Sequence, residues 1–362
     1  MLTKDFYFDL PEELVAQNPS TVRGEDKLMH VGRHDGSISH KTMHDLVDLI
    51  DPNTLMIFNN SRVRRSRTFA KKNQQNPNEQ QATKPVEFLI LENLTKSYEN
   101  FHTWRAMVKN AKKQRVGNTY TFLDGTIGTI IDNDDDVGTE FRTLIFLRPD
   151  GLRILDEQWF ETNGHIPLPP YIKRDDNEDD SERYQNVYAD QTGSAACPTA
   201  GLHFTNEILE TLSQKGIERA FVTLHVGLGT FLPVRAETIT DHAMHTEQYS
   251  ISKETANLIN DAKKQGRPIL AVGTTSVRAI ESSFDAETGL VKSGLQSTNI
   301  FLYPGKTFNV VDQLFTNFHT PESTLLMLVS AFAGKENIFN AYNKAIEEKY
   351  RFFSYGDAML IK

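Results

Sequence analysis

The distribution of apolar and polar residues divides the chain into two kinds of segment. From residue 206 onward, short apolar runs alternate with longer stretches in which apolar residues recur at helical spacing. The apolar runs are 221–226, 268–272 and 299–302, and the helical stretches are 206–215, 253–264, 277–284, 324–333 and 338–350. Buried strands that alternate with helices of this length predict an α/β fold with a mixed, mainly parallel sheet.

A different pattern occupies residues 63–150. Strand-like runs follow one another there at hairpin-like intervals marked by Gly, Asn and Asp: 86–91, 103–108, 119–122, 128–131 and 141–146. Such spacing predicts a small all-β barrel or sandwich, and we expect a barrel. The polar stretch 71–84 lacks periodicity and predicts a loop. We therefore expect a discontinuous α/β domain at 1–62 and 151–362, interrupted by a β-barrel domain at 63–150.

Composition limits the partners and the cellular compartment that we expect for the chain. Its 362 residues carry a formal net charge of −9, which argues against a generic polyanion binder but leaves room for a local basic face. Cys197 is the single cysteine, so no intramolecular disulfide can form, and a reducing cytoplasm is expected. The sequence shows neither a signal-peptide pattern nor an apolar run long enough to span a membrane, so we expect no membrane partner.

The stretch from Gly193 to Phe204 consists mostly of small side chains and ends near His203. Little side-chain bulk lets the backbone approach a ligand or another segment closely. Thr205 follows at a position where it can cap the next helix. The stretch is therefore either one wall of a binding site that includes Thr199, Gly201 and His203, or a tightly packed loop beneath that helix.

Two glycine-containing turns follow predicted strands, where α/β proteins place their ligands. The first contains Gly227, Gly229 and Thr230; no third glycine or helix follows, so the pattern does not predict a dinucleotide fingerprint. The second, from Gly273 through Thr274 and Thr275 to Ser276, opens the helix that bears Arg278. Free N–H groups and hydroxyls at a helix start favour a carboxylate or phosphate, although simple helix capping explains the same residues.

Five histidines fall in or beside loops of the α/β part: His203, His225, His242, His245 and His319. A metal site is not predicted, because His242 and His245 lack the zincin spacing and no cysteine cluster accompanies them. Acid–base chemistry or hydrogen bonding to a heterocycle suits histidine near neutral pH, and Glu247 could orient an imidazole or act as a base. A structural role remains the alternative for each histidine taken alone.

Cations beside aromatic residues form the last candidate site. Arg62, Arg64, Arg65 and Arg67 precede the inserted domain, and Lys109, Lys112, Lys113 and Arg115 lie within it near Trp104 and Tyr120. Phosphates supply affinity to cations and unpaired bases stack on rings, so a nucleic-acid surface is one interpretation. A solvated charged face is the other.

Long blocks along the chain resemble the S-adenosylmethionine:tRNA ribosyltransferase-isomerase family of queuosine biosynthesis. The resemblance extends to the N-terminus through 5–19 and 58–63. From residue 165 to the end it rests on the blocks 165–172, 182–185, 193–204, 222–231, 242–247, 271–278, 316–319, 323–328 and 350–357. The family has Asp where this chain has Asn60, Ala where it has Cys197 and Tyr where it has Lys306, and the stretch 71–84 is longer than the family's.

The resemblance implies a fold and a reaction. An α/β domain interrupted by a β-barrel would transfer and isomerise the ribosyl part of S-adenosylmethionine onto 7-aminomethyl-7-deazaguanine at the wobble position of tRNA. Epoxyqueuosine forms while adenine and methionine leave. S-adenosylmethionine is then a consumed substrate, with neither cofactor nor metal, and we expect a monomer. Alternative interpretations are another S-adenosylmethionine-using tRNA enzyme, such as a methyltransferase, and a non-enzymatic RNA-binding module.

The resemblance also implies roles for residues. The reaction needs a base beside the sulfonium, an acid for adenine and a neutral amine, and the candidates for acid–base catalysis are His203, His225, His245 and Glu247. The candidates for substrate binding are Thr199, Gly201, Gly227, Gly229, Thr230, Gly273, Thr274, Thr275, Arg278, Asn317 and His319. The candidates for tRNA binding are Arg62, Arg64, Arg65, Lys112, Lys113 and Arg115.

Overall fold

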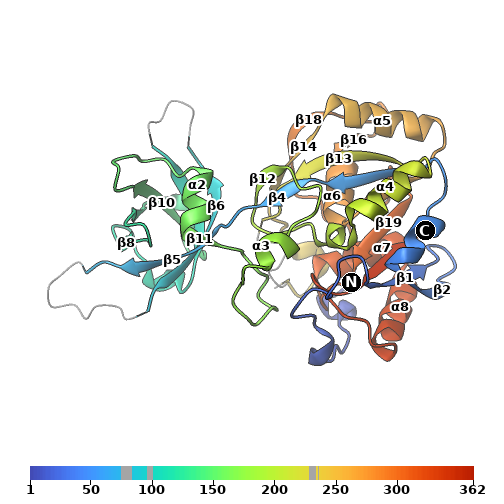
Figure 1. The fold of residues 1–362 in the computed structure, drawn as a ribbon, viewed down its shortest axis with the longest axis horizontal. Helices are drawn as coiled ribbons and strands as arrows, with labels where there is room; N and C mark the ends of the chain where they lie inside the picture. The colour runs from blue at the N-terminus through green and yellow to red at the C-terminus, as the bar shows by residue number, and fades with distance from the viewer. Residues whose placement is uncertain (75–83, 96–100, 228–233, 235) are drawn as a thin grey trace. The chain divides into compact units, whose positions relative to one another are not determined.

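Two units make up the part of the chain that the computed structural model describes, which is residues 1–74, 84–95, 101–227, 234 and 236–362 (Figure 1). One unit comprises Met1–Arg62, Pro169–Thr192 and Ala196–Lys362. The other comprises Val63–Leu168 with Gly193–Ala195. We call them the α/β unit and the barrel unit.

A nine-stranded sheet runs through the α/β unit in the order β18-β14-β13-β3-β15-β19-β20-β1-β2. Its strands are β1 (Lys27–Val31), β2 (Ile38–Thr42), β3 (Leu55–Asn59), β13 (Glu218–Leu224), β14 (Glu247–Ile251), β15 (Ile269–Val272), β18 (Gly294–Thr298), β19 (Gln313–Asn317) and β20 (Ala358–Ile361). The central strands β13, β3, β15 and β19 are parallel, as are β20 and β1. Each of the other neighbouring pairs is antiparallel. The sheet is therefore mixed, and the expectation of a mainly parallel sheet is not confirmed.

Helices cover both faces of this sheet because successive strand residues point to opposite sides. Leu55 and Ile57 of β3 join one apolar cluster, whereas Met56 and Phe58 join another. The first cluster contains α5 (Lys253–Lys264), α6 (Thr274–Ser283), α7 (Thr324–Ala333) and α8 (Lys335–Glu347). The second contains α1 (Leu46–Leu49) and α4 (Asn206–Gln214). Figure 1 shows α4 and α5 beside the sheet. Thr205 caps α4 as expected, because its hydroxyl accepts a hydrogen bond from the Ile208 N–H at 3.2 Å.

The barrel unit is a closed antiparallel barrel of six strands. They are β5 (Arg67–Lys72), β6 (Val86–Asn93), β7 (Thr103–Val108), β8 (Thr119–Thr121), β9 (Ile127–Ile131) and β10 (Phe141–Leu147). The order β5-β6-β7-β10-β9-β8 closes through pairing of β8 with β5, which confirms the predicted barrel. Helix α2 (Glu157–Asn163) contributes Trp159 and Phe160 to the barrel core, and β11 (Gly164–His165) pairs with β5.

Shorter elements complete the described chain. The stretch 71–84 was expected to be a loop; its first two residues belong to β5, and 75–83 lie outside the described residues. A strand predicted at 299–302 is wrong: β18 ends before it and β19 follows it. The remaining elements are α3 (Asp180–Arg183), β4 (Ser61–Val63), β12 (Gln191–Ser194), β16 (Phe284–Asp285), β17 (Leu290–Val291) and the short 3₁₀ turns η1 (Thr3–Phe6), η2 (Glu12–Leu14), η3 (Met43–Asp45), η4 (Ala111–Lys113), η5 (Asp134–Asp136), η6 (Thr199–His203) and η8 (Ile239–Asp241).

Candidate active site

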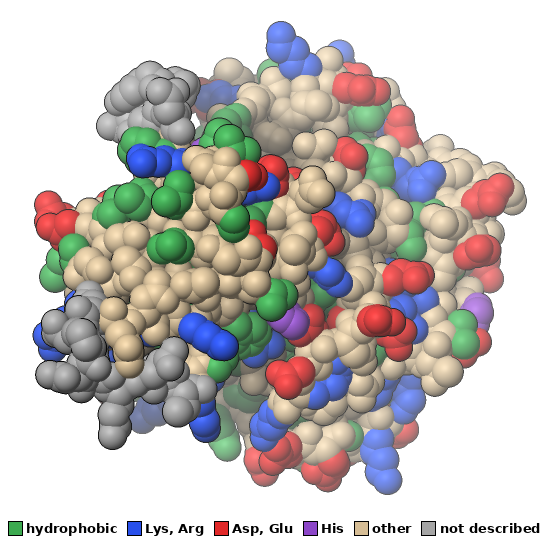
Figure 2. Space-filling view, turned by 60° about the vertical axis from the view of Figure 1, so that its left-hand side comes forward, with side chains coloured by type: hydrophobic (Ala, Val, Ile, Leu, Met, Phe, Trp, Pro, Cys, Tyr) green, Lys and Arg blue, Asp and Glu red, His purple; other side chains and the backbone are tan. Residues whose placement is uncertain are grey.

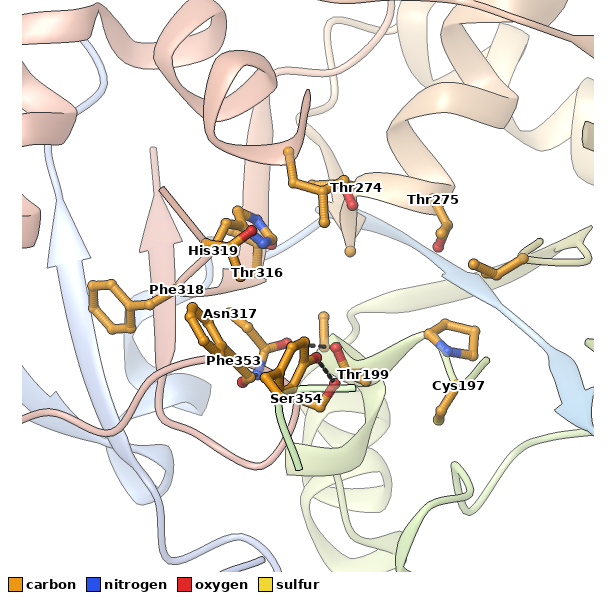
Figure 3. A pocket seen from close by; sticks show the side chains of 17 residues that line it. Cys197, Thr199, Thr274, Thr275, Thr316, Asn317, Phe318, His319, Phe353 and Ser354 are labelled. Atoms are coloured by element: carbon orange, nitrogen blue, oxygen red, sulfur yellow. Dashed lines mark hydrogen bonds between the residues drawn. The ribbon is translucent and has the colours of Figure 1, made fainter. Parts of the chain in front are cut away.

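A pocket lies at the carboxyl ends of β15 and β19 in the α/β unit (Figure 3). This edge of an α/β sheet is where such folds place their ligands. The described residues that line it are Tyr171, Cys197, Pro198, Thr199, Ala200, Val226, Gly273, Thr274, Thr275, Thr316, Asn317, Phe318, His319, Thr320, Leu325, Phe353 and Ser354. None of these side chains is an Asp, Glu, Lys or Arg. The pocket therefore combines aromatic and aliphatic surface with hydroxyl and amide groups.

The small-residue stretch forms one wall of this pocket and is also tightly packed behind it. Thr199 faces the pocket, whereas Gly201 faces the protein. A Cβ atom at Gly201 would lie 2.0 Å from the Tyr188 hydroxyl and 2.6 Å from the Asn186 amide nitrogen, so packing alone requires glycine there. Cys197 donates from its thiol to the Asn186 Oδ1 at 3.7 Å, and burial raises the pKa of this thiol well above its usual range.

The N-terminus of α6 contributes a second wall. Gly273 precedes the helix at φ +86°, a conformation that favours glycine, and no side chain caps the helix there. Thr275 is buried, lines the pocket and has an Oγ1 without a hydrogen-bond partner among the described residues. An unpaired buried hydroxyl is costly unless a ligand satisfies it. Thr274 and Thr275 thus provide two hydroxyls, beside the start of a helix, to which a polar group of a ligand can bind.

Arg278, a candidate for substrate binding, pairs with a carboxylate of the protein itself. Its guanidinium donates to both carboxylate oxygens of Glu247, with 3.4 Å between Nη2 and Oε1, and both side chains are buried. The Gly227 N–H donates to the same Oε1 at 3.3 Å. Burial lowers the pKa of Arg278 to about 10, so it stays charged at neutral pH and neutralises Glu247. Gly229 and Thr230 lie outside the described residues.

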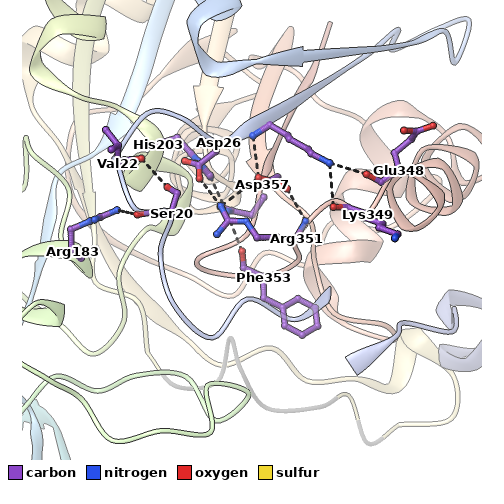
Figure 4. A network of polar contacts seen from close by, with 12 residues as sticks. Ser20, Val22, Asp26, Arg183, His203, Glu348, Lys349, Arg351, Phe353 and Asp357 are labelled. Carbon is purple, nitrogen blue, oxygen red and sulfur yellow. Dashed lines mark hydrogen bonds and ion pairs between the residues drawn. The ribbon is translucent and has the colours of Figure 1, made fainter. Parts of the chain in front are cut away.

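His203 reaches the pocket through Asn317. Its Nδ1 lies 2.7 Å from the Asp26 Oδ2, and its Nε2 lies 3.0 Å from the Asn317 amide nitrogen. Arg351 donates to the other Asp26 oxygen at 2.8 Å, as Figure 4 shows. Burial alone would raise the pKa of Asp26, but His203, Ser20 and Arg351 together lower it, so this carboxylate is ionised at neutral pH. Asn317 Oδ1 in turn accepts from the Thr199 hydroxyl at 3.2 Å.

Sequence reasoning missed Asp26, Tyr171, Phe353 and Ser354. Asp26 follows another carboxylate, Glu25, just before β1, belongs to none of the motifs, and lies 177 positions from the histidine that it contacts. Tyr171 and Ser354 share a hydrogen bond of 2.5 Å between their hydroxyls. Phe353 lines the pocket at φ +74°, a strained conformation for a bulky residue. The only signal for the last three was the set of family-like blocks 165–172 and 350–357.

The other histidines occupy different environments. His319 lines the pocket, where burial lowers its pKa from 6.5 to about 3, and its Nε2 lies 3.0 Å from the Thr316 hydroxyl. It is therefore a neutral imidazole. His225 follows β13, and its backbone N–H donates to the Gln248 carbonyl at 3.3 Å. His245 is exposed. Neither of these two belongs to the described lining of the pocket.

The basic residues differ in exposure. Arg62, Lys112, Lys113 and Arg115 are exposed. Arg64 pairs with Glu157 at 2.5 Å and Arg65 lies 3.7 Å from Glu161, so both face acidic partners on α2. Figure 2 shows Lys and Arg side chains interspersed with Asp and Glu on the face it displays.

The expectation of base-stacking rings in this region is wrong. Trp104 is 3% exposed and Tyr120 is fully buried, because both point into the barrel core. A ring that is packed on every side has no face to offer an unpaired base.

Among the described residues, no cluster of His, Cys, Asp or Glu could hold a metal ion, and no helix is long and apolar enough to cross a membrane.

Comparisons with known proteins place these features in context. Residues 3–361 match the model of a family described as queuosine biosynthesis protein. The chain is similar to proteins named S-adenosylmethionine:tRNA ribosyltransferase-isomerase: it is 52% identical to that of Treponema denticola and 46% identical to that of Clostridioides difficile, over the full length of both chains in each case. A crystal structure of S-adenosylmethionine tRNA ribosyltransferase from Thermotoga maritima is 30% identical, with a TM-score of 0.52 over 99% of this chain and 100% of that one.

Proposed function

This chain belongs to the queuosine biosynthesis protein family, and we propose that it acts as an S-adenosylmethionine:tRNA ribosyltransferase-isomerase. It uses S-adenosylmethionine and tRNA as its two substrates. Identity of 45–52% over the full length of the relatives supports this assignment, because both units are included in the match.

The reaction that we propose transfers and isomerises the ribosyl moiety onto 7-aminomethyl-7-deazaguanine at the wobble position of tRNA. Adenine and methionine leave, and epoxyqueuosine-tRNA is the product. S-adenosylmethionine is consumed as a substrate, and we propose that the reaction needs neither a cofactor nor a metal. We also propose that the chain acts as a monomer in the cytoplasm.

The observation that carries this proposal is the chemistry of the pocket. Its described lining offers aromatic rings, threonine hydroxyls and an amide, without a Lys, Arg, Asp or Glu side chain. Such a lining suits a neutral nitrogen heterocycle, which stacks on rings and exchanges hydrogen bonds in its plane. We therefore propose that Thr199, Thr274, Thr275, Asn317 and His319 bind substrate there, with Gly273 allowing close approach.

The remaining candidate residues receive roles around this pocket. We propose His225, His245 and Glu247 as the groups that transfer protons, and Arg278 as the partner that keeps Glu247 ionised. Correctly placed acid–base groups contribute roughly a hundred- to ten-thousand-fold each. The proposed roles of Gly227, Gly229 and Thr230 in approaching the adenosine, and of Arg62, Arg64, Arg65, Lys112, Lys113 and Arg115 in binding tRNA phosphates, rest on the family resemblance.

The deciding experiment incubates the protein with S-adenosylmethionine and tRNA that carries the aminomethyl-deazaguanine base. We expect stoichiometric release of adenine and methionine together with the modified tRNA, measured by chromatography and mass spectrometry. The control is the same tRNA with guanine at the wobble position, which should release nothing. S-adenosylhomocysteine as the product would identify a methyltransferase and overturn the proposal.

A further inference from the structure

The amide of Asn317 can face only one way. Its nitrogen lies 3.2 Å from the Phe353 carbonyl oxygen, and a carbonyl oxygen can only accept a hydrogen bond. The same nitrogen lies 3.0 Å from the Nε2 of His203, so that ring nitrogen must also accept. The two N–H groups of this amide, which is 3% exposed, are therefore both used inside the protein.

The histidine is held in the matching tautomer. Because Nε2 accepts, the proton of a neutral His203 must sit on Nδ1, which lies 2.7 Å from the Asp26 Oδ2. Arg351 donates to the other oxygen of Asp26 at 2.8 Å. Figure 4 shows Arg351, Asp26 and His203 side by side. In the series from Arg351 through Asp26 and His203 to Asn317, each hydrogen bond joins one donor to one acceptor, and reversing one bond would oppose the next.

One acceptor of the amide remains directed at the pocket. Asn317 lines the pocket, and its Oδ1 accepts from the Thr199 hydroxyl at 3.2 Å (Figure 3). A carbonyl oxygen has two lone pairs, so one further hydrogen bond can form. Since both N–H groups are occupied, Asn317 can offer a ligand an acceptor but not a donor.

We propose that Asn317 is a specificity-determining residue whose Oδ1 binds an N–H group of the substrate. Asp26 and His203 are then positioning residues that hold the amide with its Oδ1 toward the pocket. The inference rests on the proposed function, which supplies two sources of such a group. One is the 6-amino group of the adenine in S-adenosylmethionine. The other is the 7-aminomethyl group of the deazaguanine in tRNA, which guanine lacks.

The test measures discrimination rather than affinity alone. Calorimetry compares S-adenosylmethionine with its 6-deamino analogue, and wobble-modified tRNA with tRNA that carries guanine, for the unmodified protein and for Asn317→Leu. We expect the unmodified protein to prefer one N–H-bearing ligand at least about tenfold over its partner, and the variant to lose most of that preference. Which pair loses its preference identifies the source of the N–H group.

Asn260→Leu is the matched control for the loss of an amide. Asn260 also donates to a backbone carbonyl and accepts from a backbone N–H, both of Val291, but it does not line the described pocket. We expect this variant to retain the preference. Unchanged ratios in Asn317→Leu for both ligand pairs would overturn the inference. Failure of the unmodified protein to bind S-adenosylmethionine at all would instead overturn the proposed function.

The positioning role has its own readout. Nitrogen-15 NMR of the His203 ring should report the Nδ1–H tautomer in the unmodified protein, and Asp26→Asn should shift it toward Nε2–H. The same variant should reduce the ligand preference several-fold while its thermal unfolding stays cooperative. A preference that survives the change of tautomer would refute the positioning role, as would an Nε2–H tautomer in the unmodified protein.

Discussion

At the scale of single residues, burial decides what the candidate side chains can do. His319 was expected from the sequence to be one of several groups around a substrate, and it does line the pocket. Its pKa of about 3 follows from burial, which disfavours the charged imidazolium. A histidine in this state offers hydrogen bonds at neutral pH rather than a proton, and the sequence alone does not reveal burial at one position.

The same burial predicts a pH dependence of stability. The folded pKa of His319 lies below the 6.5 of an ordinary histidine, so the unfolded chain binds the proton first as the pH falls. As the pH falls from about 6.5 to 3, this residue should therefore lower the free energy of unfolding by about 1.4 kcal/mol for each pH unit. Urea unfolding between pH 7 and 5 should show a shallower slope for His319→Gln. The exposed His245→Gln should retain the slope, and equal slopes for His319→Gln and the unmodified protein would contradict the assignment.

Gly201 provides a second prediction at this scale. Gly201→Ala should lower the free energy of unfolding by about 1–3 kcal/mol, because its Cβ would overlap Tyr188 and Asn186 in a packed interior. Gly227→Ala is the control, since no described atom lies within 4 Å of a Cβ there and its φ is not in the left-handed region. Chemical denaturation measures both. Equal stability of the two variants would show that the wall of the pocket yields easily.

How far sequence predicts the site depends on whether partners lie near one another along the chain. Thr199, Gly273 and Asn317 were all expected near a ligand, and the structure brings them to one pocket: Gly273 follows β15, Asn317 ends β19, and Thr199 begins η6. Asp26 could not be found in this way, since its contact with His203 forms only when distant segments fold together. Arg278 was a candidate for substrate binding, and its partner Glu247, 31 positions away, is likewise brought to it only by folding.

At the scale of elements, periodic helices were predicted well and polar or edge strands were not. The stretches 206–215 and 253–264 became α4 and α5, with ends that differ by one residue at most. In contrast, β19 is buried along its whole length yet contains Gln, Thr and Asn, so its composition does not identify it as a buried strand. The exposed edge strand β18 lacks the alternation that marks a half-buried strand.

The start of α6 carries the prediction at this scale. Thr275→Val should leave the protein as stable or more stable, because it removes a buried hydroxyl that has no described partner. The same change should weaken S-adenosylmethionine binding several-fold if that hydroxyl meets the ligand. Thr275→Ser keeps the hydroxyl and should retain most of the affinity. Thermal unfolding and calorimetry measure the two properties, and parallel changes in both would indicate a purely structural hydroxyl.

At the scale of the whole molecule, the pattern of apolar and polar residues predicted the inserted barrel but could not predict the direction of the strands in the sheet. Alternating apolar runs and helices are shared by parallel and mixed sheets alike. The direction of the outer strands depends on tertiary pairings: β20 runs antiparallel to β19 and parallel to β1, at the other end of the chain. Such pairings leave no trace in local periodicity, so the sequence could not show that the sheet is mixed rather than mainly parallel.

The two units allow the two substrate interactions to be separated. Lys112 and Lys113 are exposed in the barrel unit, whereas every described residue of the pocket belongs to the α/β unit. Replacing both lysines by alanine should weaken tRNA binding and lower its salt dependence by about one to two units of the log–log slope. The affinity for S-adenosylmethionine should stay the same, as measured by calorimetry without RNA.

The matched control removes two exposed lysines, Lys253 and Lys264, from α5 in the α/β unit, and so changes the net charge equally. If tRNA responds only to the total charge of the protein, both double variants will weaken binding to the same extent. If the barrel unit contacts phosphates through Lys112 and Lys113, only the first pair will lower the salt slope. An equal loss in both variants would therefore remove these lysines from the tRNA-binding surface while leaving the proposed pocket intact.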